Sequence, residues 1–299
     1  MSEYNSSRLP FATLIADAGS TKIEWISLNP DASVGARLQT TGINALMAGY
    51  ETIISILSDV KERMGDAAPG ASIFYYGAGC ATPDICHKVS SSILDVWPGT
   101  CVEVESDLLG AARALLGHSE GIACILGTGS NSALYDGAKI IRNIPSLGFI
   151  LGDEGSGASI GKRLVRDVFR GYVPDDVRES FDKEFALSLG DLLEKVYRQP
   201  APNRFLASLV PFILNNIDNC YLRSLVIKEF SRFFKRNVAM YENSRQLPIR
   251  FLGSVAFHFA PLLLEAGEAL GFNIDSIVKN PVDGLIDYHR HLPAKNSAT

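Results

Sequence analysis

One pattern occurs twice in this 299-residue chain and limits the folds open to it. An apolar run, a short turn of Gly, Ser and Thr, and a second strand-like run occupy residues 11–28 and again 121–137. The turn glycines Gly19 and Gly129 are 110 residues apart. Apolar runs that end in glycine turns and return with alternating polarity are typical of buried β-hairpins. The repeat therefore predicts two α/β halves with the same opening hairpin, which indicates an internal duplication.

Strand and helix patterns continue after each hairpin. In the first half we expect strands at 36–42, 72–79 and 101–107, and helices at 50–64, 84–97 and 108–117. In the second half we expect a strand at 139–146 and a helical block from about 156 to 242 with interruptions near 171–176 and 199–203. A strand with a glycine turn at 248–256 and a helix at 257–271 follow. Residues 282–291 are predicted to form a last helix.

Composition excludes several classes of protein. The formal charge is -5, so the basic field of a nucleic-acid binder is missing. No apolar run reaches about 18 residues, which predicts no membrane span. The first ten residues lack the charged-then-apolar order of a signal peptide. Five scattered cysteines without a C-x-x-C motif argue against a disulfide framework or a zinc site, and favour a cytoplasmic location.

The first hairpin turn, Asp17-Ala18-Gly19-Ser20-Thr21-Lys22, has the residues of an anion-binding turn. Gly19 allows close approach of a ligand to the backbone, and successive amides with two hydroxyls could bind phosphate. Asp17 stands at the end of the strand, where it could hold Mg²⁺ through waters. Asp, Gly and Ser are also ordinary turn residues, so an unspecialised turn is the alternative.

The second turn, Gly127-Thr128-Gly129-Ser130, occupies the same place in the second half. A single glycine turn of this kind often binds nothing. Two of them, one in each half, could hold a polyphosphate from both sides.

Acidic residues stand where other segments begin. Asp107 ends the expected strand 101–107, just before a helix, and is a candidate general base for phosphoryl transfer. Capping of the helix by Ser106 or Asp107 is the alternative. Asp153 lies among four glycines at 148–157 and could bind a sugar hydroxyl or cap the next helix.

A further candidate segment, Gly253-Ser254-Val255, would suit an aromatic ring lying against the backbone, or close helix packing.

These blocks, in this order, resemble the actin-like ATPase superfamily of sugar kinases, actin and the 70-kDa heat-shock chaperones. The closest likeness is to the N-acetylglucosamine kinase branch, within the BadF/BadG/BcrA/BcrD ATPase family, and it extends from about residue 12 to 291. The motifs that carry it are ADAGSTK, ESD before a helix, GTGSN and LGDEGSG. The resemblance implies an α/β fold of two ribonuclease-H-like lobes with mixed five-stranded sheets, flanking helices and a cleft between the lobes.

The resemblance also implies domains and site residues. The lobes would span 1–118 and 119–281, the second with a helical insertion, and a helix at about 282–299 would pack back on the first lobe. Asp17 would act at Mg²⁺ and Asp107 as the catalytic base that also contacts the sugar. The remaining implied contacts are Gly19, Ser20, Thr21, Lys22, Gly127, Thr128, Gly253, Ser254 and Val255 with the nucleotide, and Asn44, Gly79, Thr128, Gly129 and Asp153 with the sugar.

The implied activity is ATP-dependent phosphorylation of an amino sugar, with N-acetylglucosamine giving its 6-phosphate as the first expectation. ATP and Mg²⁺ are the expected cofactors, a small amino sugar is the expected partner, and the chain could form a homodimer. Glucosamine or another hexosamine is the alternative substrate. An ATPase switch that acts on a partner protein is the alternative from another class.

Overall fold

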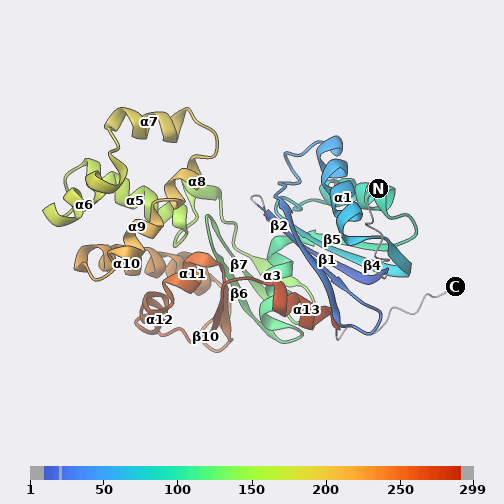
Figure 1. The fold of residues 1–299 in the computed structure, drawn as a ribbon. Helices are drawn as coiled ribbons and strands as arrows, with labels where there is room; N and C mark the ends of the chain where they lie inside the picture. The colour runs from blue at the N-terminus through green and yellow to red at the C-terminus, as the bar shows by residue number, and fades with distance from the viewer. Residues whose placement is uncertain (1–9, 20–21, 291–299) are drawn as a thin grey trace. The chain divides into compact units, whose positions relative to one another are not determined.

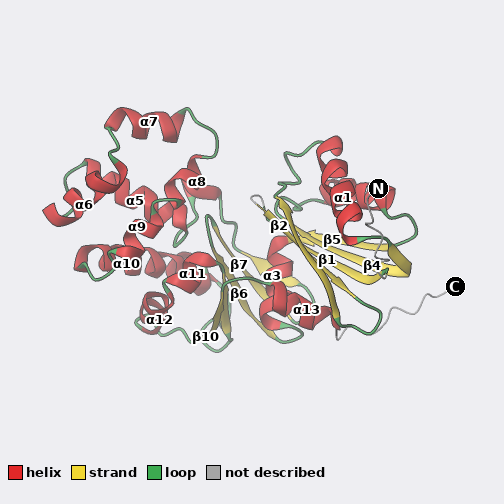
Figure 2. Ribbon diagram, in the orientation of Figure 1, coloured by secondary structure: helices red, strands yellow, loops and turns green. Residues whose placement is uncertain are grey.

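The structure is a computed structural model that describes residues 10–19 and 22–290. The chain divides into two compact units. The first unit combines Met1–Gly117 with Pro281–Thr299, and the second unit is His118–Asn280. Each unit is built around its own β-sheet (Figures 1 and 2).

The sheet of the first unit has the strand order β3-β2-β1-β4-β5. Its strands are β1 (Phe11–Ala18), β2 (Lys22–Leu28), β3 (Val34–Thr41), β4 (Ala67–Gly77) and β5 (Cys101–Ser106). β1 pairs antiparallel with β2 and parallel with β4, β2 pairs antiparallel with β3, and β4 pairs parallel with β5. The sheet is therefore mixed, and its two central apolar strands, β1 and β4, lie side by side.

Helices cover both faces of this sheet. They are α1 (Tyr50–Met64), α2 (Pro83–Val96), α3 (Asp107–Leu116) and α13 (Val282–Arg290). Alternate residues of β1 point to opposite faces. Leu14 and Ala16 join a core with Ile53 of α1, whereas Ile15 joins a second core with Leu285 of α13. α13 packs beside α3 although more than 160 residues separate them in the chain (Figure 1).

The sheet of the second unit repeats this topology. Its order is β10-β9-β6-β7-β8, formed by β6 (Glu120–Leu126), β7 (Ser130–Asp136), β8 (Ile140–Asn143), β9 (Ile249–Leu252) and β10 (Ile274–Val278). β6, β7 and β8 pair antiparallel in sequence, and β9 pairs parallel with both β6 and β10. The two sheets therefore share one strand order and one set of directions, and the predicted fold class of two mixed five-stranded sheets with flanking helices is confirmed.

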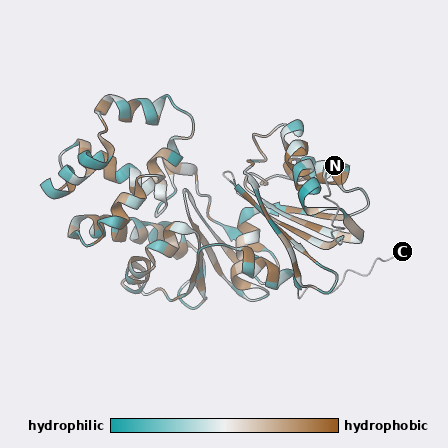
Figure 3. Ribbon diagram, viewed as in Figure 1, coloured by the Kyte–Doolittle hydropathy of each residue, from teal (hydrophilic) through white to brown (hydrophobic). Residues whose placement is uncertain are grey.

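Most helices of the second unit lie between β8 and β9. They are α4 (Gly148–Leu151), α5 (Gly157–Phe169), α6 (Asp175–Phe185), α7 (Leu189–Tyr197), α8 (Pro202–Ala207), α9 (Val210–Asn215), α10 (Cys220–Arg236) and a 3₁₀ turn η1 (Val238–Met240); α11 (Ser254–His258) and α12 (Ala260–Glu268) follow β9. Polar and apolar residues alternate along these helices (Figure 3). Their apolar sides meet β6 and β9 in one core that includes Leu126, Phe230 and Phe251.

One sequence prediction needs correction, and one strand was missed. The helix expected at 257–271 is two helices that meet at Phe259, because Pro261 in the first turn of α12 lacks an N–H and suits a new helix start. The edge strand β10 was not predicted, because it is short and none of its residues is fully buried.

No helix within residues 10–19 and 22–290 has the length and apolar character needed to cross a membrane.

Candidate functional site

Two carboxylates of the first unit lie near each other at the end of its sheet. Asp17 is the last residue but one of β1 and lies on the same face as Ile15, the face that α3 and α13 cover. Asp107 is the first residue of α3. The pKa of Asp17 is raised to about 7, first by burial and then by the neighbouring carboxylates of Glu24 and Asp107. These acidic groups are close enough for their charges to interact.

The start of α3 leaves the Asp107 carboxylate available for chemistry. Ser106 caps the helix, since its Oγ accepts a hydrogen bond of 3.2 Å from the backbone N–H of Leu109. Asp107 itself is exposed. Partial loss of hydration raises its pKa, which makes its carboxylate a stronger base than a free aspartate.

The residues around Asp17 fit a hydrated magnesium ion. Within the described part of the chain, no cluster of three or more His, Cys, Asp or Glu side chains could form a protein cage for a metal. Mg²⁺ is usually held by one or two carboxylates, several waters and substrate phosphates, so such a cage is not required. The like-charged surroundings that raise the pKa of Asp17 favour a bound cation.

Gly19 and Lys22 are described on either side of the first turn. Gly19 lies two residues after Asp17, and the side chain of Lys22 forms an ion pair with Glu24. The predicted nucleotide contacts Ser20 and Thr21 lie outside the described residues.

The structure brings Asn44 and Gly79 together. Gly79 has a φ of +83°, and a Cβ atom there would lie 2.3 Å from the Asn44 Oδ1. Only glycine allows both this backbone conformation and this approach. Oδ1 of Asn44 accepts a hydrogen bond from the Leu46 N–H, and the Lys88 ammonium of α2 donates to the backbone oxygens of Ala45 and Ala48. Asn44 is therefore held in one place by its own turn and by α2.

The second glycine turn is held by the start of α5. Gly127 donates its N–H to the carbonyl oxygen of Gly129 across the turn, at 3.0 Å. The N–H of Gly157 donates to the carbonyl of Gly127 at 2.8 Å, and the N–H of Ala158 donates to that of Thr128 at 3.0 Å. The first amides of α5 thus fix the carbonyls of the turn and leave its other side for a ligand.

Asp153 lies against this same turn. Its Oδ1 accepts a hydrogen bond of 3.2 Å from the Ser130 N–H, and a Cβ atom on Gly129 would lie 3.2 Å from its Oδ2. Asp153 has a φ of +57°, an uncommon conformation for a residue with a side chain. Burial raises the pKa of Asp153, against the opposing effects of the Ser130 amide and of Lys162. Ser156, rather than Asp153, caps α5.

A pocket of about 240 Å³ opens beside the second glycine turn. It joins Gly127 and Thr128 to Ser254 and Val255, two segments that are 126 residues apart in the sequence. Gly253, just before α11, has a φ of +123°, and a Cβ atom there would lie 2.3 Å from the carbonyl oxygen of Leu126. A side chain at 253 would therefore separate β9 from β6 at the edge of the pocket.

Sequence reasoning missed the other walls of this pocket. Its remaining lining residues are Ala207, Val210, Pro211, Leu214, His258 and Phe259. They come from α8, α9, α11 and the junction at Phe259. Most of them are apolar, and apolar residues on short helices give the same sequence pattern as an ordinary core. Lys88 was missed as well, because a lysine on a helix is usually solvated.

Comparisons with known proteins identify chains that this one resembles in sequence and fold. A candidate N-acetylglucosamine kinase from Porphyromonas gingivalis is 40% identical and superposes with a TM-score of 0.86; the match covers 96% of this chain and 100% of that one. A second candidate N-acetylglucosamine kinase, from Chromobacterium violaceum, is 18% identical with a TM-score of 0.73 over 93% and 99% of the chains. No family model and no curated protein matches the sequence.

A more distant match has the same fold. It is a ROK family glucokinase from Streptomyces griseus in complex with glucose and AMPPNP, 12% identical with a TM-score of 0.55 over 92% of this chain and 97% of that one.

Proposed function

Because this chain belongs to the family of N-acetylglucosamine kinase-like sugar kinases, we propose that it transfers the γ-phosphoryl group of ATP to N-acetylglucosamine. The chain is an ATP-dependent sugar kinase by family. The proposal is carried by one observation: each unit places acidic side chains beside a glycine turn that could bind phosphate. Asp17 and Asp107 lie close together in the first unit, and Asp153 contacts the second glycine turn in the second.

In the proposed reaction, Asp107 accepts the proton of a sugar hydroxyl as that oxygen attacks the γ-phosphorus. The bond from the γ-phosphorus to ADP breaks at the same time, and the products are a sugar phosphate and ADP. When bound near Asp17, Mg²⁺ neutralises charge on the phosphates. The glycine turns bind and orient the phosphate groups through their amides.

The sugar contacts are proposed from the same residues. Asn44 and Gly79 belong to the first unit, whereas Thr128, Gly129 and Asp153 belong to the second. A buried Asp153 that already accepts an amide hydrogen bond is well suited to accept further hydrogen bonds from sugar hydroxyls. Gly253, Ser254 and Val255, with the pocket of about 240 Å³, are proposed to hold the nucleoside.

The test is a coupled assay of ADP release with Mg·ATP and one sugar at a time. The panel contains N-acetylglucosamine, glucosamine, N-acetylmannosamine, N-acetylmuramic acid and glucose. We expect turnover that depends on N-acetylglucosamine, with a kcat in the usual kinase range of about 1–100 s⁻¹. If only glucosamine supports turnover, glucosamine replaces N-acetylglucosamine as the proposed substrate. ADP release that needs no sugar, or none with any sugar, would contradict the proposal and favour an ATPase switch.

A further inference from the structure

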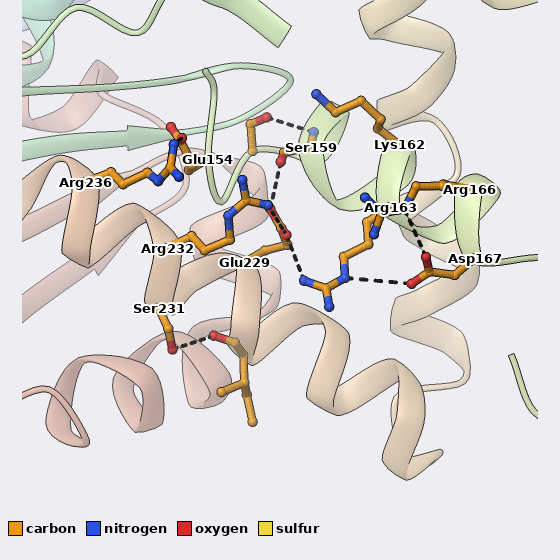
Figure 4. A network of polar contacts seen from close by, with 12 residues as sticks. Glu154, Ser159, Lys162, Arg163, Arg166, Asp167, Glu229, Ser231, Arg232 and Arg236 are labelled. Carbon is orange, nitrogen blue, oxygen red and sulfur yellow. Dashed lines mark hydrogen bonds and ion pairs between the residues drawn. The ribbon is translucent and has the colours of Figure 1, made fainter. Parts of the chain in front are cut away.

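Helix α10 carries an acidic and a basic group whose contacts the proposed reaction does not use. Glu229 has no exposed surface although it is charged, and Arg236 lies two turns further along the same helix. The sequence offered no role for this segment, because Arg232, Lys235 and Arg236 have the composition of a solvated helix face. Figure 4 shows instead that Glu229, Arg232 and Arg236 point toward the chain segment that contains Glu154 and Ser159.

Glu229 is tied to the start of α5. Its Oε2 accepts a hydrogen bond of 2.7 Å from the Ser159 Oγ. Its Oε1 accepts hydrogen bonds from Arg163 at 3.1 Å and from Arg232 at 3.0 Å. A buried carboxylate is costly unless charge and hydrogen bonds compensate it, and here all three partners do so. These contacts fix both the rotation of α5 about its own axis and its position along α10.

The start of α5 in turn fixes the second glycine turn. Ser159 is the third residue of α5, and its backbone N–H donates to the capping Ser156. The two residues before it, Gly157 and Ala158, donate their N–H groups to the carbonyls of Gly127 and Thr128. A displacement of Ser159 therefore moves the amides that hold the turn.

Arg236 is tied to the loop that carries Asp153. Its guanidinium donates to the Glu154 Oε1 at 3.2 Å, and the Glu154 side chain is only 11% exposed. Gly155, the next residue, packs against Phe233 of α10, since a Cβ atom there would lie 3.0 Å from the Phe233 Cβ. Asp153, one residue before Glu154, has a backbone conformation that is unfavourable in isolation and needs support from its surroundings.

We propose that α10 holds two positioning residues for the kinase reaction: Glu229, which sets the second glycine turn through Ser159, and Arg236, which sets Asp153 through Glu154. The inference rests on the proposed function and deepens it. Glu229 acts on the backbone of the second glycine turn, which the proposed reaction uses for the phosphates and also for the sugar. Arg236 acts on the Asp153 carboxylate, which the proposed reaction uses for the sugar alone, so we expect Glu229 rather than Arg236 to affect nucleotide binding. The two effects are therefore separable, although both residues lie on one helix.

The experiment uses four variants of the full chain. Ser159→Ala removes the hydrogen bond between Glu229 and the first turn of α5 and leaves the two arginine contacts of Glu229, one of them to Arg163, which is also in α5. Glu229→Ala is not used, because it would remove all three contacts at once and leave a cavity at a fully buried position, which would destabilise the fold. Arg236→Ala removes the contact with Glu154, and Arg236→Lys restores a cation there. Arg223→Ala is the matched control, because Arg223 is also on α10 but forms its ion pair with Glu265 of α12.

The readouts are the dissociation constant of Mg·AMPPNP by calorimetry and the separate KM values for ATP and N-acetylglucosamine. We expect Ser159→Ala to weaken AMPPNP binding roughly tenfold, since small displacements of positioning groups have large effects. We expect Arg236→Ala to raise the sugar KM roughly tenfold with AMPPNP binding changed less than about twofold, and Arg236→Lys to recover most of this loss. Arg223→Ala is expected to change neither quantity.

If Arg236→Ala weakens AMPPNP binding as much as it raises the sugar KM, and also lowers the melting temperature, Arg236 has a merely structural role. That result would overturn the inference for Arg236. If Ser159→Ala binds AMPPNP as tightly as the wild-type chain, the inference for Glu229 is overturned. The proposed function fails separately, if the wild-type chain phosphorylates none of the sugars. In that case AMPPNP binding still tests the nucleotide side, and a wild-type chain that does not bind AMPPNP would overturn both proposals.

Discussion

At the scale of single residues, the structure separates the roles of neighbouring side chains that the sequence leaves ambiguous. Ser106 caps α3, so the adjacent Asp107 is not needed for helix capping. Ser156 likewise caps α5, and Asp153 contacts the second glycine turn instead. In both loops a serine caps the helix, and the neighbouring aspartate side chain is therefore available to bind or react with a ligand. This division is what the proposed roles of Asp107 and Asp153 require.

The proposed base leads to a first prediction. Asp107→Asn removes the proton acceptor but keeps the size of the side chain, so we expect kcat to fall by a factor of about 10²–10⁴. The affinity for Mg·AMPPNP and the melting temperature are expected to stay close to those of the wild-type chain. The measurement is the coupled ADP assay together with calorimetric binding.

Glu105→Gln is the matched control for this prediction, because Glu105 lies two residues earlier on β5 and is also a carboxylate with a raised pKa. Its turnover is expected to remain within about threefold of the wild-type value. Near-normal turnover in Asp107→Asn would remove Asp107 from the mechanism.

At the scale of elements, α13 completes the face of the first sheet that carries Asp17. Its Val282, Leu285 and Ile286 share a core with Ile15 and Phe74. Gly284 allows α13 to approach α3 closely, since a Cβ atom there would lie 2.1 Å from the carbonyl oxygen of Ala114. The last helix of the chain thus supports α3, the helix that begins with Asp107.

This element makes stability depend on pH. His289 of α13 is buried, forms a hydrogen bond of 2.9 Å with the Tyr76 hydroxyl and stacks near Phe74. Burial, with a smaller contribution from Arg113, lowers its pKa to about 3 from an ordinary value of 6.5. The unfolded chain therefore binds a proton at His289 between about pH 6.5 and 3 that the folded chain does not, and stability falls as the pH falls through this range.

We expect this group to reduce the free energy of unfolding by about 2 kcal/mol between pH 7 and pH 5, since each unit of pH corresponds to 1.36 kcal/mol. Urea denaturation at several pH values measures the effect. His289→Phe is expected to lose most of this pH dependence, whereas His87→Gln, at an exposed position of α2, keeps it. An unchanged slope in His289→Phe would contradict the assignment.

At the scale of the whole molecule, two compact units each have their own sheet and core. The proposed reaction needs both, because Asp107 belongs to the first unit, whereas the second glycine turn and the nucleoside pocket belong to the second. Chains with two such units often unfold in more than one step. A ligand that binds one unit is expected to stabilise that unit most directly.

A calorimetric prediction follows from this division. Mg·ADP at 100 times its dissociation constant is expected to stabilise the folded second unit by about 2.7 kcal/mol and to raise its unfolding temperature. Gly253→Ala, which places a Cβ atom against Leu126, is expected to abolish the shift at the same ADP concentration. A full shift in Gly253→Ala, or no shift in the wild-type chain, would exclude the proposed nucleoside pocket.

The sequence by itself determined the repeated design of the molecule and most of its elements. Hydrophobic periodicity is a local property, and it identified the hairpins around Gly19 and Gly129 and the helix Tyr50–Met64 with its observed bounds. The glycine turns and the acidic residues beside them were visible for the same reason, because the spacing of their residue types is short.

Only the tertiary structure decided how these segments support one another. It paired β10 with β9, placed Asp153 against Gly129, placed Gly79 against Asn44, and turned the basic end of α10 toward Glu154. These contacts join residues far apart in the sequence, and no local pattern distinguishes a solvated arginine from one that holds a loop. Packing brings such groups within hydrogen-bond distance, and burial then gives the contact its energetic weight.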